Sequence, residues 1–421
     1  MIRKTASVVL GVLILAGCLT GCASRGKRDI IDPQKKSSGK RSVFAVSKDV
    51  EYDTGDVQSK YLNFVFESTG KFCSDYDGNI VISPASLFIA LEMTAGGADG
   101  ETLRQFTDVL VPGASDEEAF RFAADYYRDL AETEDIKLDV IDMICLNEDF
   151  SRSVYEDYYD FVKGKFDSEI FAGIRPDEID AMINEKTDGM IPEISSSIDP
   201  AADMTVINAI VFKAGWKDEY SSREIENDRV FTQNNGAEQK VTLLKSLEDG
   251  YFKAAGAKGF MKYYSGGRYA FLAILPDDDS IKINDFMVSF TYEDYLSFLR
   301  SFDESYEVEA YIPEFTVEYS NDNVSAILED MGITDAFDPG KADFSNMTGK
   351  DLCLNNIIHK TTITVDREGT EATSVTMIPG STMGGDFHPR VEVRLDRPFA
   401  YMIIDTETDI PVFIGTVNNV E

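Results

Sequence analysis

The side chains that carry most enzyme chemistry are scarce in this chain. Its 421 residues include only two histidines, His359 and His388, and five cysteines. No G-x-S-x-G elbow, H-E-x-x-H helix, phosphate-binding glycine loop or dinucleotide fingerprint occurs in it. We therefore expect no enzymatic activity, no bound metal ion and no cofactor. A Ser–His–acid triad, whose members need not be adjacent in sequence, stays open as an alternative.

Positive charge is also in short supply. Lys and Arg number 40 against 75 Asp and Glu, which gives a formal net charge of −35. Binding to nucleic acid needs clustered basic side chains, so the composition argues against such a partner. We interpret the acidity as a source of solubility. Hydrophobic residues make up 43% of the chain, which is ample for a large core.

The cysteines are too scattered for a disulfide framework or a zinc site. Cys18 and Cys22 lie near the N-terminus, and Cys73, Cys145 and Cys353 are spread over the rest of the chain. We expect the last three to be buried or inert thiols, with one disulfide bridge among them as the alternative.

The N-terminus has the pattern of a targeting segment. Arg3 and Lys4 precede an apolar run, residues 6–17, that is too short for a typical membrane-spanning helix. The sequence LTGC then ends at Cys22, and it resembles bacterial lipoprotein precursors, in which the cysteine becomes the lipidated first residue. We expect residues 1–21 to be a signal peptide and Cys22 to be lipidated. The alternatives are Cys18 at the end of LAGC, a plain secretory signal or an uncleaved anchor.

Residues 22–47 are rich in Lys, Arg, Ser and Gly and have almost no apolar content. This composition predicts a disordered tether. Its positive charge suits contact with anionic lipid headgroups, and a passive spacer is the alternative. The folded part is therefore expected outside the cytoplasm, lipid-anchored to the cell membrane or secreted.

The remainder of the chain mixes helical and extended patterns, with no internal repeat and no low-complexity linker. We therefore predict a single α+β domain over residues 48–421. The expected helices cover 56–76, 85–95, 99–111, 116–133, 179–187, 292–302 and 320–331. The expected strands cover 79–84, 136–146, 204–212, 230–232, 239–245, 250–254, 260–264, 268–275, 307–313, 390–396, 398–405 and 411–416, with a further strand beginning at 357.

The segment 357–378 carries the most informative pattern. It begins as an apolar/polar alternation typical of a strand and turns at Gly369 into small and β-branched residues. With a period of two, Thr370, Ala372, Ser374 and Thr376 share one face, and none of them is charged or large. Such a segment could be exposed at first and later slide between two strands. An ordinary hairpin arm is the alternative.

Several separate blocks resemble the serpin family in both order and spacing. NIVISPAS ends at Ser86, VINAIVFK ends at Lys213 with Trp216 shortly after it, and AYIPEF ends at Phe315. The remaining blocks are AGGA at 95–98, GET at 100–102, LEDMGITDAF at 328–337, ADFS at 342–345, IHK at 358–360, EGTEA at 368–372 and LDRPF at 395–399. The resemblance covers nearly all of residues 50–421.

The resemblance implies a serpin fold of three β-sheets surrounded by helices, with an exposed reactive-centre loop at about 369–390. It also implies a monomer that inhibits extracellular serine proteases through a covalent complex, with papain-like cysteine proteases as further targets. The protease cuts the loop and forms an acyl-enzyme, and the hinge then inserts as a new strand in the main sheet. A non-inhibitory serpin that acts as a surface binding protein is the alternative. The hinge comprises Glu368, Gly369, Thr370, Glu371, Ala372, Thr373, Ser374, Val375 and Thr376.

The scissile bond is placed by counting along the loop. Counting forward from the hinge gives Met383-Gly384, and counting back from the C-terminal block gives a position near Phe387. We prefer Met383, because the inserting side of the loop must span a fixed distance. Either residue suits chymotrypsin-like, subtilisin-like or elastase-like proteases with apolar pockets, and suits trypsin-like enzymes poorly because their pocket needs a cation.

Other positions match the family's internal sites. Ser83, Ser86, Asn208 and His359 match the serpin shutter, a buried hydrogen-bond cluster beneath the main sheet. Trp216 matches the family tryptophan at the top of that sheet.

Arg367 and Val375 are among the positions that depart from the family pattern. Arg367 stands where the family usually has Glu, so an ion pair at the top of the sheet is lost unless Glu368 or another acid replaces it. Val375 is larger than the usual Ala; we expect it to face away from the core and to slow insertion.

Overall fold

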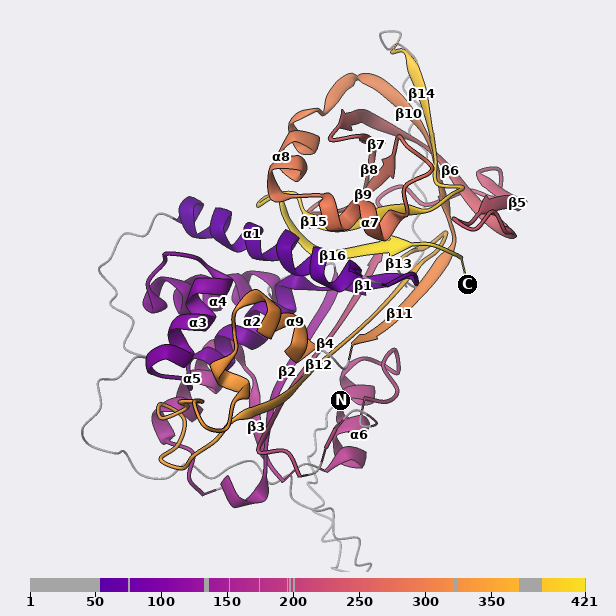
Figure 1. The fold of residues 1–421 in the computed structure, drawn as a ribbon. Helices are drawn as coiled ribbons and strands as arrows, with labels where there is room; N and C mark the ends of the chain where they lie inside the picture. Colours follow the sequence, from indigo (N-terminus) through magenta and orange to yellow (C-terminus); the bar gives the residue numbers. More distant parts are fainter. Residues whose placement is uncertain are drawn as a thin grey trace, which may run out of the picture.

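The computed structural model describes residues 54–74, 76–131, 136–150, 152–173, 175–194, 196, 198–199, 201–321, 324–370 and 388–420 (Figure 1). Within these residues, no helix has the length and apolar character needed to cross a membrane. The helices are α1 (Thr54–Cys73), α2 (Pro84–Ala95), α3 (Gly100–Leu110), α4 (Asp116–Ala131), η1 (Glu148–Phe150), α5 (Glu156–Phe166), α6 (Pro176–Lys186), α7 (Ile283–Ser289), α8 (Tyr292–Arg300), α9 (Val324–Met331) and η3 (Asp335–Phe337). The strands are β1 (Ile80–Ile82), β2 (Lys137–Leu146), β3 (Glu169–Ala172), β4 (Met204–Gly215), β5 (Ile225–Thr232), β6 (Glu238–Ala254), β7 (Ala257–Gly259), β8 (Met261–Tyr263), β9 (Tyr269–Pro276), β10 (Asp303–Pro313), β11 (Phe315–Asn321), β12 (Leu354–Val365), β13 (Gly369–Thr370), β14 (Arg390–Arg394), β15 (Phe399–Asp405) and β16 (Ile410–Val417).

Within the described part of the chain, the strands form two hydrogen-bonded sheets. The main sheet has the order β11-β12-β4-β2-β3, and its central strand β4 pairs in parallel with β12 and antiparallel with β2. A second sheet of ten strands follows the path β1-β16-β15-β9-β7-β6-β10-β14, with β5 and β8 beside it. β6 links its two halves, because its first part pairs with β5 and β10 and its end pairs with β7. The ten strands therefore supply two of the three expected β-layers.

Alternation along the central strands gives the main sheet two different apolar faces. On β2, Leu138 and Ile144 face the large core that includes α1, α2 and α4, whereas Ile141, Met143 and Cys145 face α6. α2 is buried along its whole length, as expected of a helix that is apolar on nearly every side. It packs against β2 and β4 and so supports the middle of the sheet.

Several elements differ from the sequence-based expectation. Residues 315–321 form β11 and the helix begins only at Val324, because β11 completes the edge of the main sheet by pairing with β12. β6 is unbroken, since β10 pairs with it across the polar stretch that separated two predicted strands. The prediction lacks α5, β3 and α7, although the buried residues of α5, Tyr158, Phe161, Val162 and Phe166, have helical spacing.

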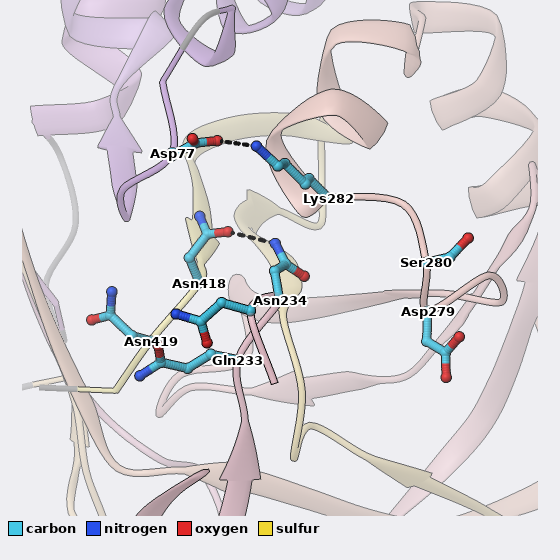
Figure 2. Close-up of a pocket in the computed structure, with 9 residues that line it drawn as sticks. Asp77, Gln233, Asn234, Asp279, Ser280, Lys282, Asn418 and Asn419 are labelled. Carbon is cyan, nitrogen blue, oxygen red and sulfur yellow. Dashed lines mark hydrogen bonds and ion pairs between the residues drawn. The ribbon is translucent and has the colours of Figure 1, made fainter. Parts of the chain in front are cut away.

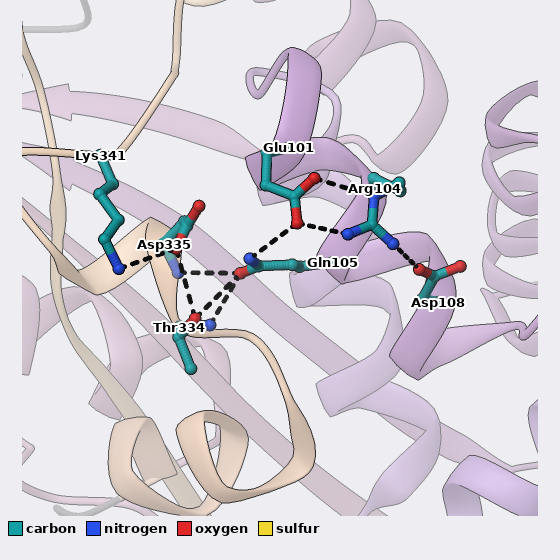
Figure 3. Close-up of polar contacts among 7 residues, drawn as sticks. All are labelled: Glu101, Arg104, Gln105, Asp108, Thr334, Asp335 and Lys341. Atoms are coloured by element: carbon teal, nitrogen blue, oxygen red, sulfur yellow. Dashed lines mark hydrogen bonds and ion pairs between the residues drawn. The ribbon is translucent and has the colours of Figure 1, made fainter.

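Gln105 on α3 holds the segment that leads to β12 (Figure 3). Its Oε1 accepts hydrogen bonds from the backbone N–H groups of Thr334 and Asp335 at 2.9 and 2.8 Å. These N–H groups lie at the start of η3, so the side chain caps that short helix from a distant part of the chain. Arg104 beside it pairs with Glu101 on the exposed side of α3. The chain before β12 is thus tied to the helical side of the fold.

Candidate functional site

The top of the main sheet is partly open. The register between β12 and β4 ends at Thr362 and Val211, although β12 itself continues to Val365. After a tight turn the chain returns as β13, which pairs antiparallel with β4 through Gly369 opposite Gly215 and Thr370 opposite Ala214. Gly369 and Thr370 of the predicted hinge are therefore already paired with the central strand.

Gly369 is required by the backbone at this return. Its φ is +147°, and a Cβ atom there would lie 2.1 Å from the carbonyl oxygen of Ala214. Asp366 closes the turn, because its Oδ1 accepts hydrogen bonds from the N–H groups of Glu368 and Gly369 at 2.8 and 3.1 Å. No other residue could bring the chain so close to β4 without displacing it.

Thr370 is fully buried beneath the turn. Its hydroxyl lies 2.8 Å from the hydroxyl of Tyr264, whose ring stacks on Trp216 with 4.6 Å between centroids and 9° between planes. Trp216 in turn donates from its backbone N to Glu368 O at 3.1 Å and from its indole Nε1 to Asp366 O at 2.8 Å. Tyr264 and Trp216 thus hold the turn and the start of the hinge. Trp216 lies at the top of the main sheet and donates two hydrogen bonds to the turn.

A buried ion pair supports Trp216 from β8 and β6. Lys262 Nζ lies 3.0 Å from Glu248 Oε1, and their side chains are only 3% and 12% exposed. The ammonium also lies 5.4 Å from the centre of the Trp216 ring and 4.5 Å from that of Tyr220. Burial raises the pKa of the Glu248 carboxyl, and Lys262 opposes that rise. No sequence pattern indicates this pair, because β6 and β8 meet only in the folded chain.

Arg367 does have an acidic partner. Its Nε and Nη2 donate to the two carboxylate oxygens of Glu314 at 2.8 and 2.9 Å. Glu314 immediately precedes β11, so the pair ties the turn after β12 to the edge strand of the main sheet. The loss expected from the departure at Arg367 is therefore compensated by Glu314 and not by Glu368.

The four predicted shutter residues lie together in the core beneath the sheet. Ser83 N–H donates to His359 Nε2 at 3.2 Å, so the proton of the neutral ring sits on Nδ1, which donates to Asn208 Oδ1 at 2.6 Å. Ser86 Oγ donates to the same Asn208 oxygen at 2.9 Å, and Ser83 Oγ donates to Val412 O at 2.8 Å. Burial lowers the pKa of His359 to about 3. The cluster therefore bridges α2, β4 and β12 with a neutral histidine.

Two further members were missed from the sequence. Thr361 Oγ1 lies 3.1 Å from His359 Nε2, and Asn208 Nδ2 donates to Asp142 Oδ1 at 2.5 Å. A signal for Asp142 was available: it shares its strand face with Leu138, Val140, Ile144 and Leu146, all apolar. An acid in that phase of a buried strand indicates a polar partner inside the core.

The remaining predicted residues divide into two groups. Cys73, Cys145 and Cys353 are buried free thiols, and His388 is exposed. Among the described residues, no group of three or more His, Cys, Asp or Glu side chains is placed to hold a metal ion. The predicted hinge, scissile and lipidation residues that lie outside the described part of the chain are Glu371, Ala372, Thr373, Ser374, Val375, Thr376, Met383, Gly384, Phe387, Cys18 and Cys22.

A separate polar hollow of about 490 Å³ lies where the C-terminus meets three connections (Figure 2). Asp77 and Lys282 pair across it at 2.7 Å, and Asn234 Nδ2 donates to Asn418 Oδ1 at 3.1 Å. The first pair joins two connections and the second bond holds Asn418, and neither sets a nucleophile beside a base. The hollow is lined by Asp77, Gln233, Asn234, Asn235, Asp279, Ser280, Lys282, Asn418 and Asn419.

Comparison with known proteins identifies the family. The family model described as "Serpin (serine protease inhibitor)" matches residues 59–420, and the chain belongs to this family. An uncharacterized serpin-like protein of Methanosarcina mazei is 27% identical over 97% of both chains. Serpin B6 of Macaca fascicularis is 31% identical over 56% of this chain and 63% of its own.

Solved structures agree with the assignment. The thermophilic serpin tengpin in its native state is 33% identical, with a TM-score of 0.78 over 89% of this chain and 96% of tengpin. Tengpin in its latent state is 30% identical, with a TM-score of 0.73 over 89% of this chain and all of that one. The predicted α+β serpin fold is confirmed. Serpins are in general inhibitors of serine proteases that act by the suicide mechanism.

Proposed function

We propose that this chain is a suicide inhibitor of extracellular serine proteases with apolar specificity. The observation that carries the proposal is the pairing of Gly369 and Thr370 with β4 where β12 has parted from it. A loop that starts here can extend antiparallel to β4, exchanging the direct bonds between β4 and β12 for bonds to a new strand. The small residues that follow Thr370 in sequence suit that path.

The chemical step is an interrupted proteolysis. The serine Oγ of the target attacks the carbonyl carbon of Met383, the bond to Gly384 breaks, and the amine of Gly384 leaves with a proton from the protease histidine. The ester at Met383 then tethers the protease to the hinge. Insertion of the hinge carries the protease away and distorts its site before water can attack the ester. Phe387 is the alternative scissile position.

The energy for this displacement comes from the main sheet. Before cleavage, β12 and β4 bond directly to each other and the hinge contributes only two residues. A full inserted strand adds a row of backbone hydrogen bonds on both sides and buries one face of the hinge. The cleaved chain is therefore expected to be more stable than the intact one, which makes the native state metastable.

Incubation with proteases tests the proposal. The full chain is mixed with chymotrypsin and with subtilisin, and with papain as the cysteine protease, and each mixture is run on a denaturing gel. We expect a band at the summed mass with the serine proteases, and a cleaved form that melts later than the intact chain. Clean cleavage without such a band, and without a gain in melting temperature, would instead indicate a non-inhibitory serpin that acts as a surface binding protein.

Mass spectrometry of the peptide released from the complex identifies the scissile bond. A C-terminal fragment that begins at Gly384 supports Met383 as the bait residue, and a fragment that begins at His388 supports Phe387. Either result fits an apolar specificity pocket in the target. Cleavage after Arg390 would contradict the apolar specificity.

We also propose that the chain is anchored outside the cytoplasm through a lipid on Cys22. The supporting observations are the short apolar run, the LTGC sequence and the basic tether of residues 22–47. Labelling cells with a radioactive fatty acid should mark the protein, and Cys22→Ser should abolish the label while Cys18→Ser retains it. The reverse pattern would assign the lipid to Cys18.

A further inference from the structure

Asp142 is a carboxyl group inside the apolar core. It lies on β2, is 4% exposed, and shares the core-facing side of the strand with Val140 and Ile144. Its neighbour across the strand pair is Asn208 on β4, directly in register. An acid at this depth must be neutral, paired or unusually well hydrogen-bonded to be tolerated.

Among the described residues, one side chain donates a hydrogen bond to Asp142. Asn208 Nδ2 donates to Oδ1 at 2.5 Å, whereas Oδ2 is buried and has no partner among the described residues. Within that part of the chain, no basic side chain pairs with it. The groups that face it are Asn208 on β4, with His359 of β12 and Ser86 of α2 beyond, and the phenol of Tyr127 on α4, which couples to it electrostatically.

Other titratable groups nearby do not change charge near neutral pH. Burial lowers the pKa of His359 to about 3 and raises that of Tyr127 to about 12. Glu169 on β3 is in register with Met143, so it lies toward the opposite face of the sheet. Burial raises the pKa of Asp142 to about 7, against the opposing effect of the Asn208 hydrogen bond.

Asp142 is joined to the contact that must break when the sheet opens. Asn208 and His359 are in register on β4 and β12, and their side chains meet at 2.6 Å. A strand inserted between β4 and β12 moves them apart by roughly 5 Å, one strand spacing, so this hydrogen bond cannot survive. The separation removes the His359 donor from Asn208 Oδ1, which keeps the bond from Ser86, while the amide nitrogen stays beside Asp142 on the neighbouring strand.

We propose that Asp142 makes opening of the main sheet between β4 and β12 dependent on pH, with the closed sheet held more firmly when this carboxyl group is neutral. The neutral form leaves only an unpaired hydroxyl group in the core, which costs less free energy than an unpaired negative charge. The ionised form lacks compensation in the closed core and gains it when opening lets water reach the cluster. This property concerns the sheet itself and holds whether or not the chain traps a protease.

The direction and size of the effect follow from linkage. In the closed sheet, burial raises the pKa of Asp142 to about 7. In the opened sheet, where water reaches the carboxyl group, its pKa returns toward the ordinary value of 3.8. Ionisation therefore favours opening, and the preference grows as the pH rises through 7. Between pH 6 and pH 8 the opening rate is expected to rise by up to about tenfold and then to level off.

Trp216 provides the measurement. It is the only tryptophan in the chain, and its indole bonds to the turn that precedes the hinge, so its fluorescence reports hinge insertion. The uncleaved full chain is held a few degrees below its melting temperature from pH 5 to pH 9, and the rate of the fluorescence change is recorded. We expect conversion to be up to about tenfold faster at pH 8 than at pH 6 in the wild type.

Two variants assign the effect to one residue. Asp142→Asn keeps the size of the side chain but cannot ionise, so its rate should be flat across the same range. Asp139→Asn, on the same strand but with a side chain 36% exposed, is the matched control and should retain the wild-type slope. A flat wild-type profile overturns the proposal, and this result needs no variant to fold. A slope that persists in Asp142→Asn also overturns it and moves the dependence to another buried acid such as Glu92.

Discussion

Arg367 and Glu314 form a two-bond ion pair at the top of the main sheet, with Nε–Oε1 and Nη2–Oε2 distances of 2.8 and 2.9 Å. The pair joins the turn that precedes the hinge to the edge strand β11. Its side chains are 46% and 23% exposed, so solvent screens part of the attraction. The family's charge order is therefore altered at Arg367 while a tie between the two strands is kept.

Loss of this ion pair should lower the stability of the fold only slightly. Exchanging the two charged residues should restore most of the stability lost when Arg367 alone is changed to Glu. We expect Glu314→Gln to lower the free energy of unfolding by about 0.2–1 kcal/mol, because the pair is partly exposed and bidentate. Arg367→Glu alone should cost more through repulsion, and Arg367→Glu with Glu314→Arg should recover most of the loss. Thermal unfolding at low and high salt measures this. A double variant no better than Arg367→Glu would show that the pair contributes nothing.

Thr370 should control whether a cut loop inserts. The side chain is fully buried and its hydroxyl lies 2.8 Å from that of Tyr264, so an arginine there would place a charge in the core. Under the proposed function, we expect the protease to cleave Thr370→Arg without being trapped, with the covalent band on the denaturing gel reduced at least tenfold. Thr370→Ser keeps the hydroxyl and should retain the band. Equal complex yields from the two variants would contradict the proposed path of insertion.

The buried pair of Lys262 and Glu248 gives a stability prediction. Lys262→Met leaves Glu248 unpaired at 12% exposure, and we expect it to lower the free energy of unfolding by about 3–5 kcal/mol. The double variant Lys262→Met with Glu248→Gln removes both charges and should be less destabilised than the single one. Denaturant unfolding of the three proteins tests this. Equal losses in single and double variants would assign the effect to packing against Trp216 and Tyr220.

His359 should make stability fall in mild acid. Burial lowers its pKa to about 3 from an ordinary value of 6.5. As the pH falls below 6.5, the ring is protonated in the unfolded chain but stays neutral in the folded chain. The stability contributed by the neutral ring is therefore present above pH 6.5 and is lost as the pH falls toward 3. The measurement is the free energy of unfolding between pH 5 and pH 6.5 for the wild type and for His359→Gln.

Asp142 has the opposite sign in this range, since its raised pKa makes the folded chain more stable as the pH falls. The comparison for His359 is therefore made in the Asp142→Asn background, where only the ring titrates within the cluster. There the parent should lose stability toward pH 5 and the His359→Gln protein should not. Parallel curves for the two would mean that the ring is not buried in its neutral form.

The local patterns of the sequence were enough to place most of the helices and strands. Apolar-rich stretches marked β2 and β4, apolar/polar alternation marked β12, and the small uncharged face that begins at Thr370 pointed to a segment able to enter a sheet. These features depend on propensity and on residues near one another, so the sequence alone carries them.

The tertiary structure decided which distant side chains meet. Glu314 lies 53 residues from Arg367, Glu248 lies 14 from Lys262, and Asp142 lies 66 from Asn208, and strand pairing or sheet packing brings each pair together. No periodicity encodes such a contact, because the register between two strands is set by the whole core rather than by either strand. The charge state of Asp142 and of His359 depends on the same packing, since burial by surrounding helices shifts both.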